Sequence, residues 1–281
     1  MADIEVFDKE RYTLGEGPYY DPRFHRLSWV DIVGKKLWTL KEGKKNSYDV
    51  GQLLGAAVPL KESDGFLLAM EDGLYGFQEG EISLFQDMRS VYKDYWRSND
   101  AKADKAGRLW VGAIVKDEEH GPEGGLFLHH KGNIHCRISD TKLANGMAWS
   151  KDQSRFFFSD SEKHMVFSYD YDQSLGDISG GKPLFQVEDG VPDGMTIDSD
   201  DNLWVAIWGG NRIEKRDGRT GKLLEKIFLP ATQVSSCCFG DEDYKTLYIT
   251  SAAIGQTGEF DGCIFRLRTD VTGVAPDYVV L

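Results

Sequence analysis

The stretch Val191-Pro192-Asp193-Gly194-Met195-Thr196-Ile197-Asp198 leads through polar residues 199–202 into Leu203-Trp204-Val205-Ala206. It predicts a short strand, a turn and a second strand, because proline and glycine mark its start and β-branched and aromatic residues fill its second half. Five other places in the chain repeat this layout. The repeat, more than any single motif, decides the predicted fold.

Six copies of the second strand are evenly spaced along the chain. They recur with a period of roughly 44 residues, which is the spacing of propeller blades. A further strand candidate follows each copy, and no long amphipathic helix interrupts the series. The sequence therefore predicts an all-β fold, a closed six-bladed β-propeller with four-stranded antiparallel blades. The copies are residues 27–31, 66–70, 109–113, 156–160, 203–207 and 247–251.

We expect residues 1–281 to form this propeller as a single domain. The strand candidates Ile4-Glu5-Val6-Phe7 and Tyr278-Val279-Val280-Leu281 are expected to share the closing of the ring. Two units carry longer insertions, residues 116–124 and 252–262, which predict loops over one face.

Charge and composition restrict the partners. The formal net charge of -13 would repel the phosphates of nucleic acid and of anionic lipids, which leaves small molecules and cations; protein partners stay open. No apolar run approaches the roughly 20 residues that span a bilayer. The first residues, Met1-Ala2-Asp3-Ile4-Glu5, lack the basic and apolar parts of a signal peptide, so we expect a cytoplasmic protein.

The innermost strand of each blade lines the central channel of a propeller. The positions roughly ten residues before each copy are therefore equivalent and face one another. Four of the six are carboxylates or carboxamides, and converging oxygens with no equivalent lysine would repel one another without a cation. Such oxygens suit Ca²⁺, with Mg²⁺ or Mn²⁺ as substitutes, whereas no histidine supports a zinc site. Capping of strand ends or binding of channel water is the alternative. The positions are Glu16, Ala56, Asn99, Asn145, Asp193 and Ser236.

An ordered set of motifs resembles the family of gluconolactonase, regucalcin (senescence marker protein) and luciferin-regenerating enzyme. The resemblance covers nearly the whole chain, and the motifs occur in the family's order. They are Leu14-Gly15-Glu16-Gly17-Pro18, Arg97-Ser98-Asn99-Asp100, Ala144-Asn145-Gly146-Met147-Ala148-Trp149-Ser150, Pro192-Asp193-Gly194-Met195 and Ser235-Ser236-Cys237-Cys238-Phe239-Gly240.

The resemblance implies a carboxylic ester hydrolase that opens sugar lactones with one divalent cation on the propeller axis. Ca²⁺ is favoured, with Mg²⁺, Mn²⁺ or Zn²⁺ as alternatives. The implied metal ligands are Glu16, Asn145 and Asp193, with Asn99 beside them. Arg97 and Asn99 would bind the lactone, and Asp193 would also act as the acid or base.

The third-blade insertion is implied to add an acidic residue to the substrate site. Asp117, Glu118 and Glu119 all compete for this role, and we favour Asp117. The family commonly has glycine and proline where this chain has Ala101 and Lys105, which predicts a different shape for the third-blade loop.

The predicted chemistry is metal-assisted hydrolysis of a ring ester, in which the ion polarises the carbonyl and water attacks. Either Asp193 acts through an oxygen held loosely by the ion, or water on the ion is itself the nucleophile. Three alternatives stay open. The same site could hydrolyse another ester or an organophosphate, the protein could bind calcium or luciferin with little catalysis, or the propeller could be a protein scaffold.

Overall fold

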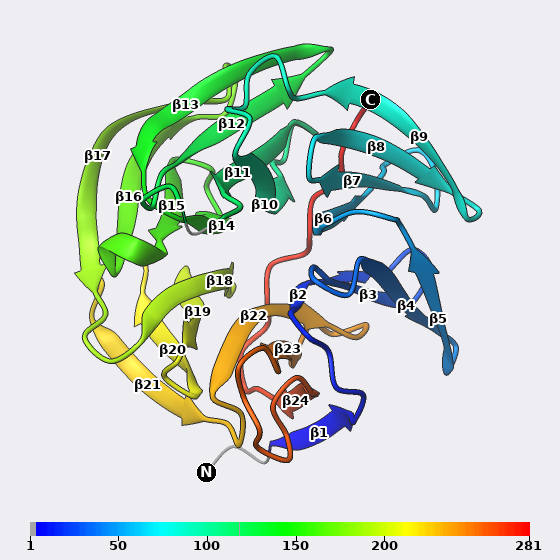
Figure 1. The fold of residues 1–281 in the computed structure, drawn as a ribbon. Coiled ribbons are helices and arrows are strands. Elements are labelled where there is room, and N and C mark those ends of the chain that lie inside the picture. The colour runs from blue at the N-terminus through cyan, green and yellow to red at the C-terminus, as the bar shows by residue number, and fades with distance from the viewer. Residues whose placement is uncertain (1–3, 118) are drawn as a thin grey trace.

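The chain forms a ring of six antiparallel, four-stranded sheets around a common axis (Figure 1). This computed structural model describes residues 4–117 and 119–281. Within five of the sheets the strands follow one another in chain order. The predicted all-β, six-bladed propeller with four-stranded blades is confirmed.

The strands are named in chain order. Blade 1 contains β2 (Gly15–Asp21), β3 (Arg26–Asp31), β4 (Lys36–Lys41) and β5 (Lys44–Asp49). Blade 2 contains β6 (Leu54–Pro59), β7 (Phe66–Met70), β8 (Gly73–Gln78) and β9 (Glu81–Asp87). Blade 3 contains β10 (Trp96–Ala103), β11 (Leu109–Val115), β12 (Gly124–His130) and β13 (Asn133–Thr141).

The second half of the chain continues the series. Blade 4 contains β14 (Ala144–Trp149), β15 (Arg155–Asp160), β16 (Met165–Asp172) and β17 (Asp177–Gln186), with the short 3-10 helix η1 (Ser161–Lys163) after β15. Blade 5 contains β18 (Val191–Ile197), β19 (Asn202–Trp208), β20 (Arg212–Asp217) and β21 (Leu223–Phe228). Blade 6 contains β22 (Gln233–Gly240), β23 (Thr246–Ala252), β24 (Ile264–Arg268) and β1 (Glu5–Asp8).

The six copies that reveal the repeat are the second strands of the blades. Every residue of β3 and β7 is buried, whereas the outer strand β5 is mostly exposed. The second strands need apolar residues on both faces because neighbouring blades cover them from both sides. The hydrophobic core therefore lies between blades, as in the cluster that joins Val58 and Leu67 of blade 2 to Leu109 and Val111 of blade 3.

A repeated hydrogen bond ties the first strand of a blade to the second. In blade 3 the indole Nε1 of Trp110 donates to Asp104 Oδ2 at 3.0 Å. In blade 5 the indole Nε1 of Trp204 donates to Asp198 Oδ2, also at 3.0 Å. Both aspartates are completely buried, and a buried carboxylate needs such donors. This bond explains why an aspartate precedes a tryptophan by the same interval in both repeats.

The ring is closed by the N-terminal strand alone. β1 pairs with the free edge of β24, with Glu5 opposite Arg266 and Val6 opposite Phe265. The prediction that the C-terminal residues 278–281 share this role is wrong. Because β1 occupies the edge of β24, the chain after β24 has no strand position left in blade 6.

The C-terminal segment instead crosses one end of the channel, where its red trace runs across the ring (Figure 1). We call residues 272–281 the strap. The backbone N–H groups of Val274, Val279 and Val280 donate to carbonyls at Ile197, Pro59 and Gly107, at 3.1, 3.0 and 2.9 Å. Ile197 and Pro59 are the last residues of the inner strands β18 and β6, and Gly107 lies in the turn that follows the inner strand β10. The strap therefore covers the end of the channel at which the inner strands finish.

The two long insertions lie at the other end. Residues 116–123 join β11 to β12, and residues 253–263 join β23 to β24, so both connect a second strand to a third. The second strand of a blade runs antiparallel to the inner strand, so a connection from the second strand to the third lies at the end where the inner strand begins. Both insertions are therefore loops on the same face, as predicted. Within the described residues, no helix is long and apolar enough to cross a membrane.

Candidate active site

A β-bulge interrupts each inner strand near its start. A bulge bends one strand of a pair and changes the direction in which its side chains point. Asn99, Asn145 and Asp193 lie within the bulges of their strands, and Glu16 borders its own. The pairing with the second strand shifts register between Glu16 and Tyr19, Leu54 and Ala56, Ser98 and Ala101, Ala144 and Met147, Pro192 and Met195, and Val234 and Ser236.

Four predicted site residues gather at this level of the channel. Glu16, Asn99, Asn145 and Asp193 come from four different blades, and each is between 5% and 8% exposed. The amides of Asn99 and Asn145 are directly hydrogen-bonded, at 2.8 Å. Ser236 is also buried at its equivalent position, whereas Ala56 contributes no polar group. The structure thus brings together the residues that the repeat alignment places in register.

Glycine follows both Asn145 and Asp193 because neighbouring inner strands approach closely there. A Cβ at Gly146 would lie 2.8 Å from the backbone nitrogen of Met195. A Cβ at Gly194 would lie 2.5 Å from Cβ and 2.9 Å from Cα of Ser236. Side-chain carbons do not normally come this close to other atoms. The two glycines therefore allow the strands to converge on the axis.

The two predicted acidic ligands repel each other. Burial raises the pKa of Glu16 to about 8, and the neighbouring carboxylate of Asp100 adds to the effect. Burial also raises the pKa of Asp193 well above its usual range, with Glu16 as the next cause. Asp193 Oδ1 is buried and has no hydrogen-bond partner among the described residues. A bound cation would relieve both the repulsion and the missing contact.

The donor set fits a hard divalent cation. Glu16 and Asp193 supply carboxylate oxygens and Asn145 supplies an amide oxygen, which are ligands that Ca²⁺ and Mg²⁺ prefer. Within residues 4–117 and 119–281, no three His, Cys, Asp or Glu side chains form a metal-binding cluster. This does not contradict the fit, because the third donor here is an asparagine. The lack of His and Cys in the set disfavours Zn²⁺.

Arg97 and Asn99 form one arm of the site. Arg97 Nη1 donates to Asn99 Oδ1 at 3.0 Å and to the carbonyl of Ser98 at 2.8 Å. Asn99 Nδ2 then donates to Asn145 Oδ1 and to the carbonyl of Ala144. The oxygen of Asn99 is therefore turned toward Arg97, and its nitrogen faces Asn145. In this orientation Asn99 holds Arg97 and Asn145 and does not present an oxygen to a cation.

Arg97 is cationic at neutral pH. Burial lowers its pKa to about 10, while the carboxylates of Glu71 and Glu16 oppose the change. Glu71 follows β7 and is itself 3.3 Å from the ammonium of Lys116. Glu71 could not be predicted as a neighbour of Arg97, because it lies in a different repeat and matches no motif.

Asp117, the acidic residue favoured in the third-blade insertion, makes hydrogen bonds within its own loop. Asp117 is exposed, and its Oδ1 lies 2.8 Å from His120 Nδ1 and accepts the backbone N–H of Glu119 at 3.0 Å. The ring of His120 stacks on Tyr95 with 3.6 Å between centroids. Asp117 thus stabilises a turn of its own loop, and its hydrogen bonds to described residues all lie within that loop. Glu118, the second candidate, lies outside the described residues.

The sequence departures at Ala101 and Lys105 lie outside this insertion. Ala101 is buried in β10 just after the bulge, and Lys105 lies in the turn between β10 and β11. That turn is at the strap end of the blade, far along β11 from the insertion. The effect of these two positions on the shape of the third-blade loop stays a prediction.

A lysine that the sequence analysis missed lies further along the channel. Lys102 Nζ donates to the backbone carbonyls of Met147 at 2.9 Å and Met195 at 2.8 Å, and so joins blade 3 to blades 4 and 5. It is two residues beyond Asp100 on β10, and the alternation of a strand places both side chains on the channel side. Between this lysine, Asp100 and Ser236 lies a cavity of about 20 Å³, the size of one water molecule.

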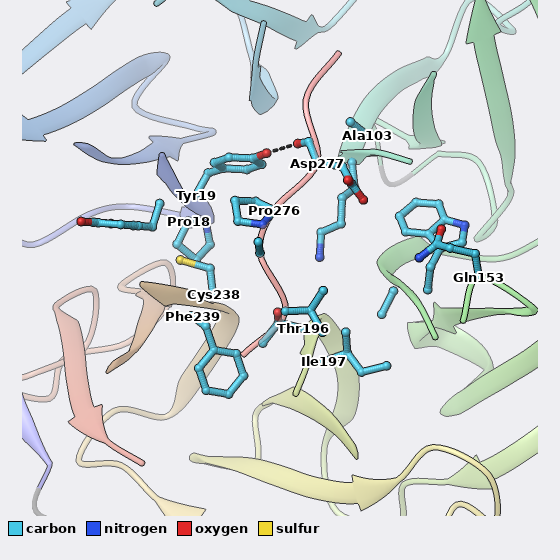
Figure 2. Close-up of a pocket in the computed structure, with 16 residues that line it drawn as sticks. Pro18, Tyr19, Ala103, Gln153, Thr196, Ile197, Cys238, Phe239, Pro276 and Asp277 are labelled. Atoms are coloured by element: carbon cyan, nitrogen blue, oxygen red, sulfur yellow. Dashed lines mark hydrogen bonds between the residues drawn. The ribbon is translucent and has the colours of Figure 1, made fainter. Parts of the chain in front are cut away.

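A second cavity of about 80 Å³ lies under the strap (Figure 2). Lys102 lines this cavity as well as the smaller one. The walls of the second cavity include Tyr19, Thr196 and Cys238 from three inner strands, and Pro276 and Asp277 of the strap close it. The hydroxyl of Tyr19 donates to the carbonyl of Asp277, which fixes the middle of the strap. Lys102 and the strap together obstruct the channel on this side of the candidate site.

Comparison with known proteins identifies the family of this chain. The family model described as "SMP-30/Gluconolactonase/LRE-like region" matches residues 14–253. The chain belongs to this family. The family resemblance seen in the five motifs is therefore confirmed, and all five lie within the matched residues.

Members of the SMP-30/Gluconolactonase/LRE-like family match along almost the full chain. Regucalcin of Danio rerio is 33% identical over 97% of both chains. The Bacillus subtilis protein named "Putative sugar lactone lactonase YvrE" is 32% identical over 95% of this chain and 94% of its own. The solved structure of a luciferin-regenerating enzyme is 31% identical, covers 100% of both chains and superposes with a TM-score of 0.94.

Proposed function

We propose that the protein is a divalent-cation-dependent lactonase that hydrolyses the ring ester of sugar lactones. The observation that carries the proposal is the pair of buried carboxylates, Glu16 and Asp193, with raised pKa values beside the cationic Arg97. The sugar lactone as substrate is supported by the family and by the name of the Bacillus subtilis relative. A cytoplasmic location stays a prediction.

The proposed ligands are Glu16, Asn145 and Asp193. Asn99 becomes a further ligand only if its amide turns over and releases Arg97. When bound, the cation would polarise the lactone carbonyl and stabilise the negative charge that develops on its oxygen. Ca²⁺ and Mg²⁺ suit the oxygen donors best, with Mn²⁺ as a substitute.

The chain's own residues would orient the substrate and move the proton. A guanidinium has five N–H donors, and the described residues use only those of Arg97 Nη1, so the others are available to the lactone oxygens. Asp193 has two carboxylate oxygens, so the one that the cation does not hold can accept a proton from the attacking water. The water oxygen bonds to the carbonyl carbon, the ring C–O bond breaks, and the proton ends on the released alkoxide.

The decisive experiment is hydrolysis of glucono-1,5-lactone, followed as acid release after chelation and after separate addition of Ca²⁺, Mg²⁺, Mn²⁺ or Zn²⁺. We expect turnover above the spontaneous rate only with an added cation. Asp193→Asn at saturating cation should lower kcat by about 10² to 10⁴-fold, the usual contribution of a general base. Near-normal turnover of this variant would refute the proposed role.

One competing function uses the same residues. Buried carboxylates and an amide oxygen could bind calcium without catalysing any reaction. Tight cation binding with no lactone hydrolysis for any added ion would favour that function. Hydrolysis of another ester or of an organophosphate, but of no lactone, would instead favour the alternative substrate.

A further inference from the structure

Ser161 links the candidate ligand Asn145 to the strand that carries Asp193. It is the first residue of η1, between β15 and β16, and is 1% exposed. Its hydroxyl oxygen accepts a hydrogen bond from Asn145 Nδ2 at 2.9 Å. The same hydroxyl donates to the carbonyl of Pro192 at 2.7 Å. One buried side chain therefore joins the inner strands of blades 4 and 5 beside the axis.

These bonds complete a chain of side-chain hydrogen bonds that all run in the same direction. Arg97 donates to Asn99, Asn99 to Asn145, Asn145 to Ser161, and Ser161 to the carbonyl of Pro192. A guanidinium can only donate, and a backbone carbonyl can only accept. The two ends of the chain therefore set the direction of every bond between them.

The direction decides how the amide of Asn145 is oriented. Because the hydroxyl hydrogen of Ser161 is committed to Pro192, the hydroxyl offers Asn145 only an acceptor. The nitrogen of Asn145 must then face Ser161, and its oxygen must face Asn99. That oxygen accepts one hydrogen bond and keeps a second lone pair. The reverse orientation would place two N–H groups where a cation has to bind.

We infer that Ser161 is a positioning residue, which keeps the oxygen of Asn145 available to the cation. The inference rests on the proposed cation-dependent function and assigns no contact between Ser161 and the ion. Partners that orient metal ligands typically contribute 10 to 100-fold to metal affinity, so a change of about that size is expected when the hydroxyl is removed.

The test compares Ca²⁺ affinity, measured by competition with a chelating dye, between Ser161→Ala and a matched control. The control is Ser159→Ala, two residues earlier on β15, whose hydroxyl is equally buried but has no hydrogen-bond partner in the described structure. We expect Ser161→Ala to weaken binding by about 10 to 100-fold and Ser159→Ala to leave it within about twofold. If Ser161→Ala does not fold, Ser161→Cys serves, because a thiol is a weak donor and acceptor.

A double substitution separates orientation of the amide from a general loss of structure. In an Asn145→Asp background both side-chain ends are oxygen, so there is no amide to turn. Adding Ser161→Ala to this background should change the Ca²⁺ affinity by no more than about twofold. An undiminished loss of affinity in this background would overturn the inference.

The outcomes distinguish the two proposals. Binding of Ca²⁺ by the unmodified protein together with unchanged affinity of Ser161→Ala would refute the role of Ser161 and leave the proposed function intact. Failure of the unmodified protein to bind Ca²⁺, Mg²⁺ or Mn²⁺ would refute the proposed cation-dependent function itself, and the role of Ser161 with it.

Discussion

Cation affinity at the axial site should fall steeply as the pH is lowered, because protons and the cation compete for the same carboxylates. The pKa of Glu16 is raised to about 8 in the protein without a cation. Above this pH the Glu16 carboxylate is ionised, and its own contribution to the affinity is at a plateau. Below it, each further pH unit should weaken binding by about tenfold through Glu16 alone. The affinity should therefore be about tenfold below the plateau near pH 7 and about 100-fold below it near pH 6.

Asp193 should make the dependence steeper. Its pKa is also raised, by burial and then by Glu16, so a second proton has to leave when the cation binds. For both groups the cation affinity falls as the pH is lowered, since protonation removes the negative charge that attracts the ion. Asp193→Asn removes one of these protons and should give a shallower slope together with weaker binding at every pH.

The assay is a Ca²⁺ titration from about pH 6 to pH 9 at constant ionic strength, with the protonation of the chelating dye measured separately. Calorimetry in buffers of different ionisation enthalpy should also detect proton release when Ca²⁺ binds near pH 7. A dissociation constant that stays within about twofold across this range would refute the account, because it would show that both carboxylates are already ionised in the cation-free protein.

Three further predictions concern the scaffold. Lys102→Met leaves two buried carbonyls without their donor. In denaturant titrations it should lower the free energy of unfolding by about 2–5 kcal/mol. The control Lys105→Met, at an exposed position, should have little effect on this free energy. Gly194→Ala forces a Cβ against Ser236. It should lower the free energy of unfolding by about 1–3 kcal/mol and weaken Ca²⁺ binding. An unchanged free energy of unfolding would contradict the close approach of β18 and β22. Deletion of residues 272–281 should speed hydrogen exchange at the amide of Lys61, which donates to Val279, but not at the amide of Val187 in blade 4.

The sequence predicts the blades well because the same physical demands recur in each one. A strand covered on both faces is buried along almost its whole length, and a run of consecutive apolar residues marks the second strand of every blade. Asn99, Asn145 and Asp193 could be aligned because a bulge occurs at the same point of each inner strand. The roles of these residues, and the interpretation of residues 1–281 as one domain, remain predictions.

Features that depend on contacts between repeats could not be predicted. The period does not indicate which terminus completes the last blade, since both ends offer a short apolar run, and only the free edge of β24 decides in favour of β1. Ser161 lies in a segment that matches no motif, and its importance comes from the approach of η1 to Pro192. Lys102 was missed because the alignment compared only one position on each inner strand.

The obstruction of the channel by Lys102 and the strap has a consequence for kinetics. A site with one open side admits substrate and releases product by the same route. If the proposed reaction occurs there, the hydroxy acid must leave before the next lactone can enter. The acid should then behave as a competitive inhibitor, raising the apparent KM without changing kcat.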